Sequence, residues 1–435
     1  MRSTLSKVPL KGLAAPPDTN RRPPHLRLRT IEAGNADALG YNRGLMRVVF
    51  LQNSAVNESL ALTELSAVLK AEGHETQLYL SDEEKDLDGE LKRYAPDLAI
   101  IPCHVTGHDV ALGFSRLIKR LRPGCTVVFG GTHATFDPEI AMDPSVDACV
   151  VGEAEGAMVE LAEALSRRAD WRHIQNLAFD ADGTLHKNEL RPLISDLDTL
   201  PIPDRDLYYR YRFISKFPWK KFTTGRGCVH SCSFCWNTTL ADMYKGKGVF
   251  TRRKSPTRAV DEVVHVLEAH PTKTIHFSDD LFTVYPKWLE EFAEEYRSRV
   301  PIPFTCNTSI ELVNSRTMGA LARAGARGVG IGIETGNEDL RSKILNKTVT
   351  NQDIREAAKT IKGQGLELIT YNMIASPGET IDDAFATLNL NREIQADHVR
   401  CNLAIPLPHT AWERSNLETG GLAADYGENR VASME

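Results

Sequence analysis

The densest group of reactive side chains is a cysteine-rich loop with the sequence GRGCVHSCSFCWN. Within it, Cys228, Cys232 and Cys235 are separated by three and two residues. Thiolates are soft ligands that suit an iron–sulfur cluster or a zinc ion. Structural zinc normally takes four protein ligands, and no second Cys-x2-Cys or Cys-x2-His pair follows in the sequence. Three ligands on a [4Fe–4S] cluster would leave one iron open, so the spacing favours such a cluster.

The elements that position this loop form a β/α series. From residue 222, six apolar runs alternate with helical patterns, the latter over 256–269, 286–299, 315–324, 338–364 and 380–395. Right-handed β/α units of this kind curl into a partial barrel whose active site lies at the carboxyl ends of the strands. The cysteine loop follows the first of these strands, so we expect it at the mouth of a partial (β/α)6 barrel over residues 222–412.

A second series precedes the barrel. Residues 46–168 alternate helices with five strand patterns, MRVVFLQ, ETQLYL, DLAIIPCH, TVVFGG and ACVVGE. Continuous apolar strands separated by helices indicate a parallel sheet covered on both faces. The predicted fold class is therefore α/β, with an N-terminal doubly wound parallel sheet followed by the barrel. Ligands of such sheets bind beyond the carboxyl ends of the strands.

Neither pattern is sustained at the two ends of the chain, and residues 169–221 mix short strands, turns and prolines. We expect a flexible leader over residues 1–45, a connector over 169–221 and a C-terminal tail over 413–435. The arginines of the leader could contact RNA or a partner, although runs of charge are usually solvated tails.

The charge balance excludes some functions. The 435 residues hold 52 basic and 58 acidic side chains, for a formal net charge of −6, so no global basic field would bind nucleic acid or an anionic membrane. No run approaches the roughly 18 apolar residues of a membrane helix, and the start lacks the apolar core of a secretory signal. We expect a cytoplasmic protein whose five other cysteines pack in the interior.

The cysteine spacing, the aromatic Phe234 before the third cysteine and the six-unit β/α domain together resemble the radical S-adenosylmethionine (SAM) superfamily over about residues 220–410. The resemblance implies that the three cysteines hold a [4Fe–4S] cluster whose open iron binds SAM. The reduced cluster would then cleave SAM to methionine and a 5′-deoxyadenosyl radical. It also implies a small-molecule substrate and a reductant such as flavodoxin or ferredoxin.

The same resemblance implies SAM contacts at the ends of later strands. Asp279 and Asp280 in HFSDDLF occupy the place where the family binds the methionine amino group, although two aspartates alone are more typical of a helix cap. Asn307 and Ser309 are candidates for contacts to the ribose or carboxylate. Glu334 in GIGIETG matches a glutamate that the family places against SAM.

The first domain resembles the cobalamin-binding domain of one branch of this superfamily, through APDLAIIPCHVTG, VVFGGTHATFDPE and VDACVVGEAEG. The cobalamin contacts implied are Cys103, Thr106, Gly130, Gly131, Thr132, Gly152 and Glu153. The first strand is followed by LQNSAVNES rather than an Asp-x-His-x-x-Gly loop. We therefore expect no protein histidine on the cobalt.

The predicted function is that of a cobalamin-dependent radical SAM methyltransferase acting on an unactivated carbon or on phosphorus. One alternative is a ring-closing or rearranging enzyme with the same cofactors. Another is a methylthiotransferase, whose second cluster would use Cys103, Cys125 and Cys149. A third is a zinc-stabilised binding protein without catalysis.

Overall fold

A computed structural model describes residues 44–55 and 58–418 of the chain, all of which fall in one compact unit. The predicted leader, apart from its last two residues, lies outside the described part. The same holds for residues 419–435 of the predicted tail.

The first sheet begins with five parallel strands in the spatial order β2-β1-β3-β4-β5. They are β1 Arg47–Gln52, β2 Glu75–Leu80, β3 Leu98–Pro102, β4 Thr126–Gly130 and β5 Ala148–Val150. The helices between and after them are α1 Leu60–Ala71, α2 Leu87–Tyr94, α3 His108–Leu121, α4 Thr132–Phe136 and α5 Glu155–Ser166. The strands match the predicted apolar runs.

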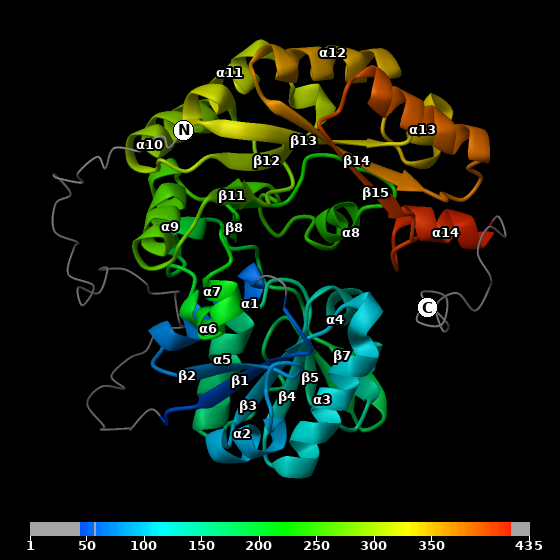
Figure 1. The fold of residues 1–435 in the computed structure, drawn as a ribbon. Helices are drawn as coiled ribbons and strands as arrows, with labels where there is room; N and C mark the ends of the chain where they lie inside the picture. Colours follow the sequence, from blue (N-terminus) through cyan, green and yellow to red (C-terminus); the bar gives the residue numbers. More distant parts are fainter. Residues whose placement is uncertain (1–43, 56–57, 419–435) are drawn as a thin grey trace. The chain divides into compact units, whose positions relative to one another are not determined.

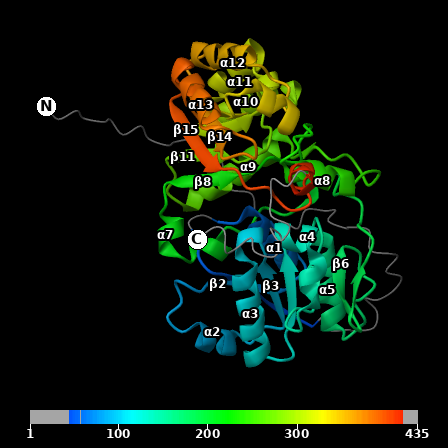
Figure 2. The same ribbon diagram turned by 90° about the vertical axis from the view of Figure 1, so that its right-hand side faces the viewer.

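Both faces of this sheet are buried, because alternate residues of one strand point to opposite sides. In β1, Val48 and Phe50 pack into the core that includes α1 and α5. Val49 and Leu51 pack into a second core that includes α3. Figure 2 shows α3 and α5 flanking β3 on either side. The doubly wound arrangement predicted from the sequence is confirmed.

A hairpin extends the first sheet. Strands β6 (Leu177–Ala181) and β7 (Thr184–Lys187) pair antiparallel next to β5 and bring the sheet to seven strands. Asp182 and Gly183 at the turn have φ of 53° and 84°, the pair of positive values that a two-residue type I′ hairpin requires. Residues 177–187 of the predicted connector, in which short strands were expected, therefore pair with the first sheet. The rest of that stretch holds the short helices α6 Asp206–Tyr209 and α7 Arg212–Ser215.

The second sheet has six parallel strands in the order β15-β14-β13-β12-β11-β8. They are β8 Trp219–Phe222, β11 Thr274–Phe277, β12 Phe304–Thr308, β13 Ala326–Glu334, β14 Glu367–Ile374 and β15 His398–Leu403. The helices are α9 Pro256–Ala269, α10 Pro286–Arg299, α11 Ser315–Ala324, α12 Asn351–Gly363 and α13 Ile381–Glu393. Figure 1 shows α10 to α13 on one face of the curled sheet. The predicted partial barrel is confirmed, with a first strand that begins at residue 219 instead of 222.

Three smaller elements complete the barrel mouth. A two-residue ladder pairs β9 (Gly225–Arg226) with β10 (Arg252–Arg253), and helix α8 (Trp236–Met243) follows the cysteine loop. Helix α14 spans Ala411–Glu418, across the predicted boundary between the barrel and the tail at residue 412, and its Trp412 is buried. None of the helices that the structure describes combines the length and the apolarity needed to cross a membrane.

Candidate active site

The three loop cysteines lie between β9 and α8, and Cys235 is the N-cap residue of α8. All three are half-buried. Desolvation, with smaller contributions from Cys235 and Cys228, raises the pKa of Cys232 to about 11 in spite of the nearby Lys347 ammonium. Each thiol is thus close enough to influence the others. The sequence reasoning did not single out Lys347, because a lysine in a loop carries no local signal.

Segments far along the chain hold this loop in place. The indole N–H of Trp236 donates to the carbonyl of Pro408 (2.9 Å), and the amide of Trp412 donates to the carbonyl of Ser233 (3.0 Å). Ser233 in turn donates its amide to the carbonyl of Leu345 (3.1 Å). The loop is therefore anchored both to the segment after β13 and to the start of α14.

This donor set fits an iron–sulfur cluster better than a single metal ion. Among the described residues, no group of three or more Cys, His, Asp or Glu side chains could hold one metal ion. A cluster instead takes its thiolates from around a larger iron–sulfur core. The three thiols of one loop, close to each other and to a lysine, match that requirement.

The two aspartates after β11 have different surroundings. Asp279 is buried, and both its oxygens accept the amide of Thr224 (3.1 and 3.0 Å), while Oδ1 also accepts the Thr224 hydroxyl (2.7 Å). Asp280 is exposed at the strand end. Desolvation raises its pKa in spite of a hydrogen bond from Asn237. Asp279 thus holds the end of β8, and Asp280 has the freer carboxylate.

The ends of β12 and β14 carry buried polar atoms that have no hydrogen-bond partner. These atoms are Ser309 Oγ, Ser376 Oγ and Glu379 Oε1. Buried polar atoms are normally paired, so three orphaned oxygens at the mouth indicate room for a polar ligand. Asn307, by contrast, accepts a hydrogen bond from the Tyr371 hydroxyl (2.8 Å). The sequence predicted Ser309 but assigned no role to Ser376 or Glu379.

Glu334, at the end of β13, has a strained backbone. Its backbone φ is 66°, a value that residues other than glycine rarely adopt. Its carboxylate pairs with the ammonium of Lys347 (2.9 Å). Both side chains are 11% exposed. Strain of this kind concentrates at ligand sites, where the surroundings hold it in place. Glu334 and Lys347 thus form an ion pair beside the cysteine loop.

A cavity of about 440 Å³ lies at the carboxyl ends of the first sheet. Among the residues predicted to contact cobalamin, five line it: Gly130, Gly131, Thr132, Gly152 and Glu153. Cys103 is buried and does not line it, and the side chain of Thr106 lies outside the described part of the structure. The lining also includes His104, so the expectation of a cobalt without protein histidine stays a prediction.

The far wall of this cavity comes from α8. Its side chains Asn237 and Leu240, with Tyr244 just beyond the helix, line the cavity, and the Tyr244 hydroxyl accepts the amide of Glu153 (2.9 Å). A Cβ on Gly152, whose φ is +77°, would collide with that hydroxyl. Glycine is therefore required here both by the backbone and by the tyrosine.

Charged side chains of the two sheets meet beside this cavity. The acidic residues are Glu64 of α1 with Glu153 and Glu155. Arg226 contacts all three carboxylates at 2.7, 2.9 and 2.5 Å. Arg252 adds a contact to Glu153 (2.8 Å) and Lys254 one to Glu64 (3.2 Å). Buried carboxylates are tolerated only when paired, so this network links the cavity to the strands that precede and follow the cysteine loop.

This network predicts a loss of stability in acid. Burial by itself would raise the pKa of Glu64, but Lys254 and Arg226 more than offset it and hold the pKa at about 2, below the ordinary 4.5. A carboxylate with a lowered pKa stabilises the folded state above pH 4.5, and this stabilisation is lost as the pH falls towards 2. The free energy of unfolding should fall by on the order of 3 kcal/mol over this range. Urea unfolding of the wild type and of Glu64→Gln at several pH values would check this. The variant should lose less stability over that window, and equal losses would contradict the assignment.

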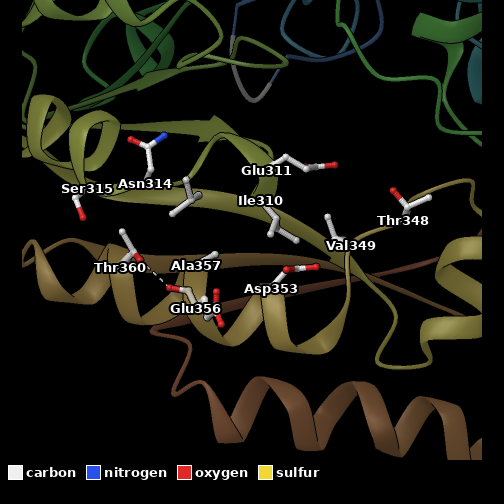
Figure 3. A pocket seen from close by; sticks show the side chains of 11 residues that line it. Ile310, Glu311, Asn314, Ser315, Thr348, Val349, Asp353, Glu356, Ala357 and Thr360 are labelled. Carbon is white, nitrogen blue, oxygen red and sulfur yellow. Dashed lines mark hydrogen bonds between the residues drawn. The ribbon is translucent and has the colours of Figure 1, made fainter.

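A separate groove of about 540 Å³ lies on the outside of the barrel, between the turn after β12 and helix α12 (Figure 3). Its acidic side chains have local structural partners. Asp353 completes the capping box of α12 with Thr350, and Glu356 accepts a hydrogen bond from Gln352 (3.0 Å). We assign this groove no function.

Comparison with known protein families matches both halves of the chain. A model of the radical SAM superfamily matches residues 222–390, and a model of the B12-binding domain matches residues 46–162. This chain is a member of the radical SAM superfamily. It belongs to the branch that carries a B12-binding domain ahead of the barrel, and its cofactors are a [4Fe–4S] cluster, SAM and cobalamin.

Relatives of this radical SAM enzyme cover most of its length. An uncharacterized methyltransferase of Pyrococcus horikoshii is 29% identical over 74% of this chain and 70% of its own. An anaerobic magnesium-protoporphyrin IX monomethyl ester cyclase of Rubrivivax gelatinosus is 25% identical over 79% and 63%. The solved radical SAM methyltransferase TsrM from Kitasatospora setae superimposes with a TM-score of 0.71 at 19% identity, over 86% and 75% of the two chains. The last likeness shows that the fold is shared.

Proposed function

We propose that this radical SAM enzyme is a cobalamin-dependent methyltransferase that acts on a carbon or phosphorus centre of a small molecule. One observation carries the proposal. Helix α8 begins at Cys235 of the cysteine loop, and its residues Asn237 and Leu240 line the cavity of the first sheet. The residues that would hold the cluster and those that would hold cobalamin are thus joined by a single short helix. The names of the Pyrococcus relative and of TsrM support the same reaction class.

The residues of this chain divide the work of binding. Cys228, Cys232 and Cys235 would hold the cluster, and Asp280, Ser309 and the Glu334–Lys347 pair would bind the polar groups of SAM. Of the two predicted aspartates, we assign the amino group to Asp280, because Thr224 already occupies the oxygens of Asp279. Gly130, Gly131, Thr132 and Gly152 would let a flat corrin approach the backbone. When bound, these groups supply radical chemistry and a transferable methyl group.

The buried network and the apolar cavity set the conditions for this chemistry. Ion pairs around Arg226 fix the strand before the cysteine loop against the first sheet. Apolar side chains of the lining, such as Leu240 and Phe250, would help to keep water away from reactive species. We place the enzyme in the cytoplasm, with a reductant such as flavodoxin or ferredoxin.

The ring-closing alternative is supported by the name of the Rubrivivax relative, since it would use the same cofactors. The methylthiotransferase alternative is disfavoured by geometry. Cys103 follows β3 whereas Cys125 precedes β4, and these strands are parallel and in register. By this register the two cysteines are offset by six residue steps along the sheet, which separates their backbones by roughly 20 Å. Cys103, Cys125 and Cys149 are all buried, and burial raises their pKa values. They behave as packed small side chains.

Metal content and isotopic transfer test the proposal. Anaerobically reconstituted protein should contain about four irons and one cobalt per chain, with the spectra of both cofactors. Eight irons without cobalt would indicate the methylthiotransferase, and colourless zinc protein the binding protein. Methyl-labelled SAM should pass its label to an acceptor molecule. If 5′-deoxyadenosine forms with a substrate that gains no label, the ring-closing alternative replaces the proposal.

A further inference from the structure

The helix-free face of the second sheet carries a group of basic side chains. Alternate strand residues such as Phe277, Phe304 and Cys306 pack into the core beneath the helices. The residues between them face the other way. Lys221 of β8 and His276 of β11 are partners in the strand register, and Arg400 of β15 is the partner of Tyr371. We call Lys221, His276 and Arg400 the basic cluster.

Aromatic and hydroxyl groups lie beside these side chains. The His276 ring stacks on Trp219 with centroids 5.8 Å apart, and its Nδ1 lies 2.9 Å from the hydroxyl of Thr305. Lys221 Nζ lies 5.4 Å from the Trp219 centroid. On the other strand pair, the Arg400 guanidinium lies 5.8 Å from the Tyr371 centroid.

The cations of the basic cluster lack counter-ions. Elsewhere on this domain Lys347, Arg327 and Lys362 each pair with a carboxylate. Within the described residues, neither Lys221 nor Arg400 has a carboxylate within 4.0 Å. Burial lowers the pKa of His276 to about 4, and Arg400 and Lys221 both contribute, so the two cations act on the same imidazole. Two unpaired cations around one neutral imidazole form a place for an anion.

The cluster lies on the same face as a predicted SAM contact. Tyr371 donates its hydroxyl to Asn307 Oδ1 (2.8 Å) across β13. The hydrogen bond passes over Gly330 of β13. A Cβ there would lie 2.6 Å from the Tyr371 ring and 2.7 Å from Asn307 Oδ1, so this position needs glycine. The chain Arg400–Tyr371–Asn307 thus leads from the basic cluster to the strand end where Ser309 follows.

We propose that Lys221 and Arg400, arranged around His276, bind an anionic group of the substrate, a carboxylate or a phosphate. The inference rests on the proposed function, because it places the substrate inside the barrel of a SAM-dependent enzyme. Charge-assisted hydrogen bonds to lysine and arginine would anchor that end of the substrate, and the rest would extend towards the SAM site.

Equilibrium dialysis of the reconstituted protein with three probes tests the inference. Benzoate and phenyl phosphate carry the two candidate anions, and benzamide is a neutral analogue of benzoate. We expect one or both anions to bind, with an affinity that falls as salt is added, and benzamide to bind at least about tenfold more weakly. The better anion identifies the group.

Variants localise the site. Lys221→Gln and Arg400→Gln should each weaken binding of the better anion about tenfold, and Arg400→Lys should retain most of it. Lys287→Gln, whose side chain is 91% exposed on α10, makes the same change of charge elsewhere and should alter nothing. The iron–sulfur cluster content and the circular dichroism of each variant verify that it is folded.

Failure to bind either anion, equal binding of benzamide, or wild-type binding by both glutamine variants would each overturn the inference. The proposed function is judged separately, by 5′-deoxyadenosine formation and by iron and cobalt content in the wild type. If the basic cluster binds an anion but the protein does not cleave SAM, the proposed function is refuted and the anion site still stands.

Discussion

Cys232→Ala is expected to remove the iron–sulfur cluster and all formation of 5′-deoxyadenosine. A cluster left with two of its three thiolates loses a ligand that no other cysteine replaces, because none of the remaining five cysteines lies in this loop. Iron content, the visible absorption of the cluster and chromatography of the nucleoside products measure the effect. The first sheet should remain folded, since Cys232 contributes to neither of its cores.

Cys401→Ala is the matched control for this prediction. Cys401 is exposed on β15, outside the loop, and its replacement should leave about four irons per chain. A Cys232→Ala protein that still cleaved SAM would refute the assignment of the loop, and loss of iron in Cys401→Ala would show that iron content is not a specific readout.

Gly152→Ala is expected to lower cobalamin affinity by about tenfold or more, because the new Cβ takes the place of the Tyr244 hydroxyl in the cavity wall. Cobalt content after reconstitution and absorbance titration with hydroxocobalamin measure the change. Adding Tyr244→Phe removes the closest of these contacts, that with the hydroxyl, and leaves ring carbon Cζ at 2.8 Å, so the double variant should recover part of the affinity.

Gly73→Ala separates strain from steric blocking. Gly73 also has a positive φ, 92°, but a Cβ there would meet nothing within 4 Å. The substitution should cost about 1 kcal/mol of stability and leave cobalamin binding unchanged. Equal loss of cobalamin in Gly73→Ala and Gly152→Ala would attribute the effect to backbone strain and contradict the role of Tyr244.

Sequence patterns predicted the parts of this fold that depend on periodicity. Helices over 256–269, 286–299 and 315–324 have the predicted bounds, because each has an apolar stripe of helical period and a clear start signal. The hairpin 177–187 was missed although its Asp-Gly turn is a hairpin signal. Helix α14 was missed because AWERSNLE is short and mostly polar.

The site was predictable only where a motif carries its own chemistry. The spacing of the three cysteines can be read directly from the sequence. The contribution of Arg226 depends on Glu64, 162 residues away, and that of Tyr244 on Glu153, 91 residues away. Such pairs leave no local trace in one sequence. The expectation that all five other cysteines pack was wrong for Cys401, because an edge strand exposes residues that a central strand would bury.

The ionic network has a consequence for the order of events during synthesis. Its carboxylates, Glu64, Glu153 and Glu155, leave the ribosome well before Arg226, Arg252 and Lys254. Until those cations emerge, the first domain carries a cluster of like charges that must stay hydrated. The core on the α3 side of the first sheet can form at once, whereas the other core also contains barrel residues such as Phe222 and Phe277. The cavity rim, too, gains its counter-ions only when the barrel begins to appear. Pairing of the charges at that rim is therefore a late step of folding.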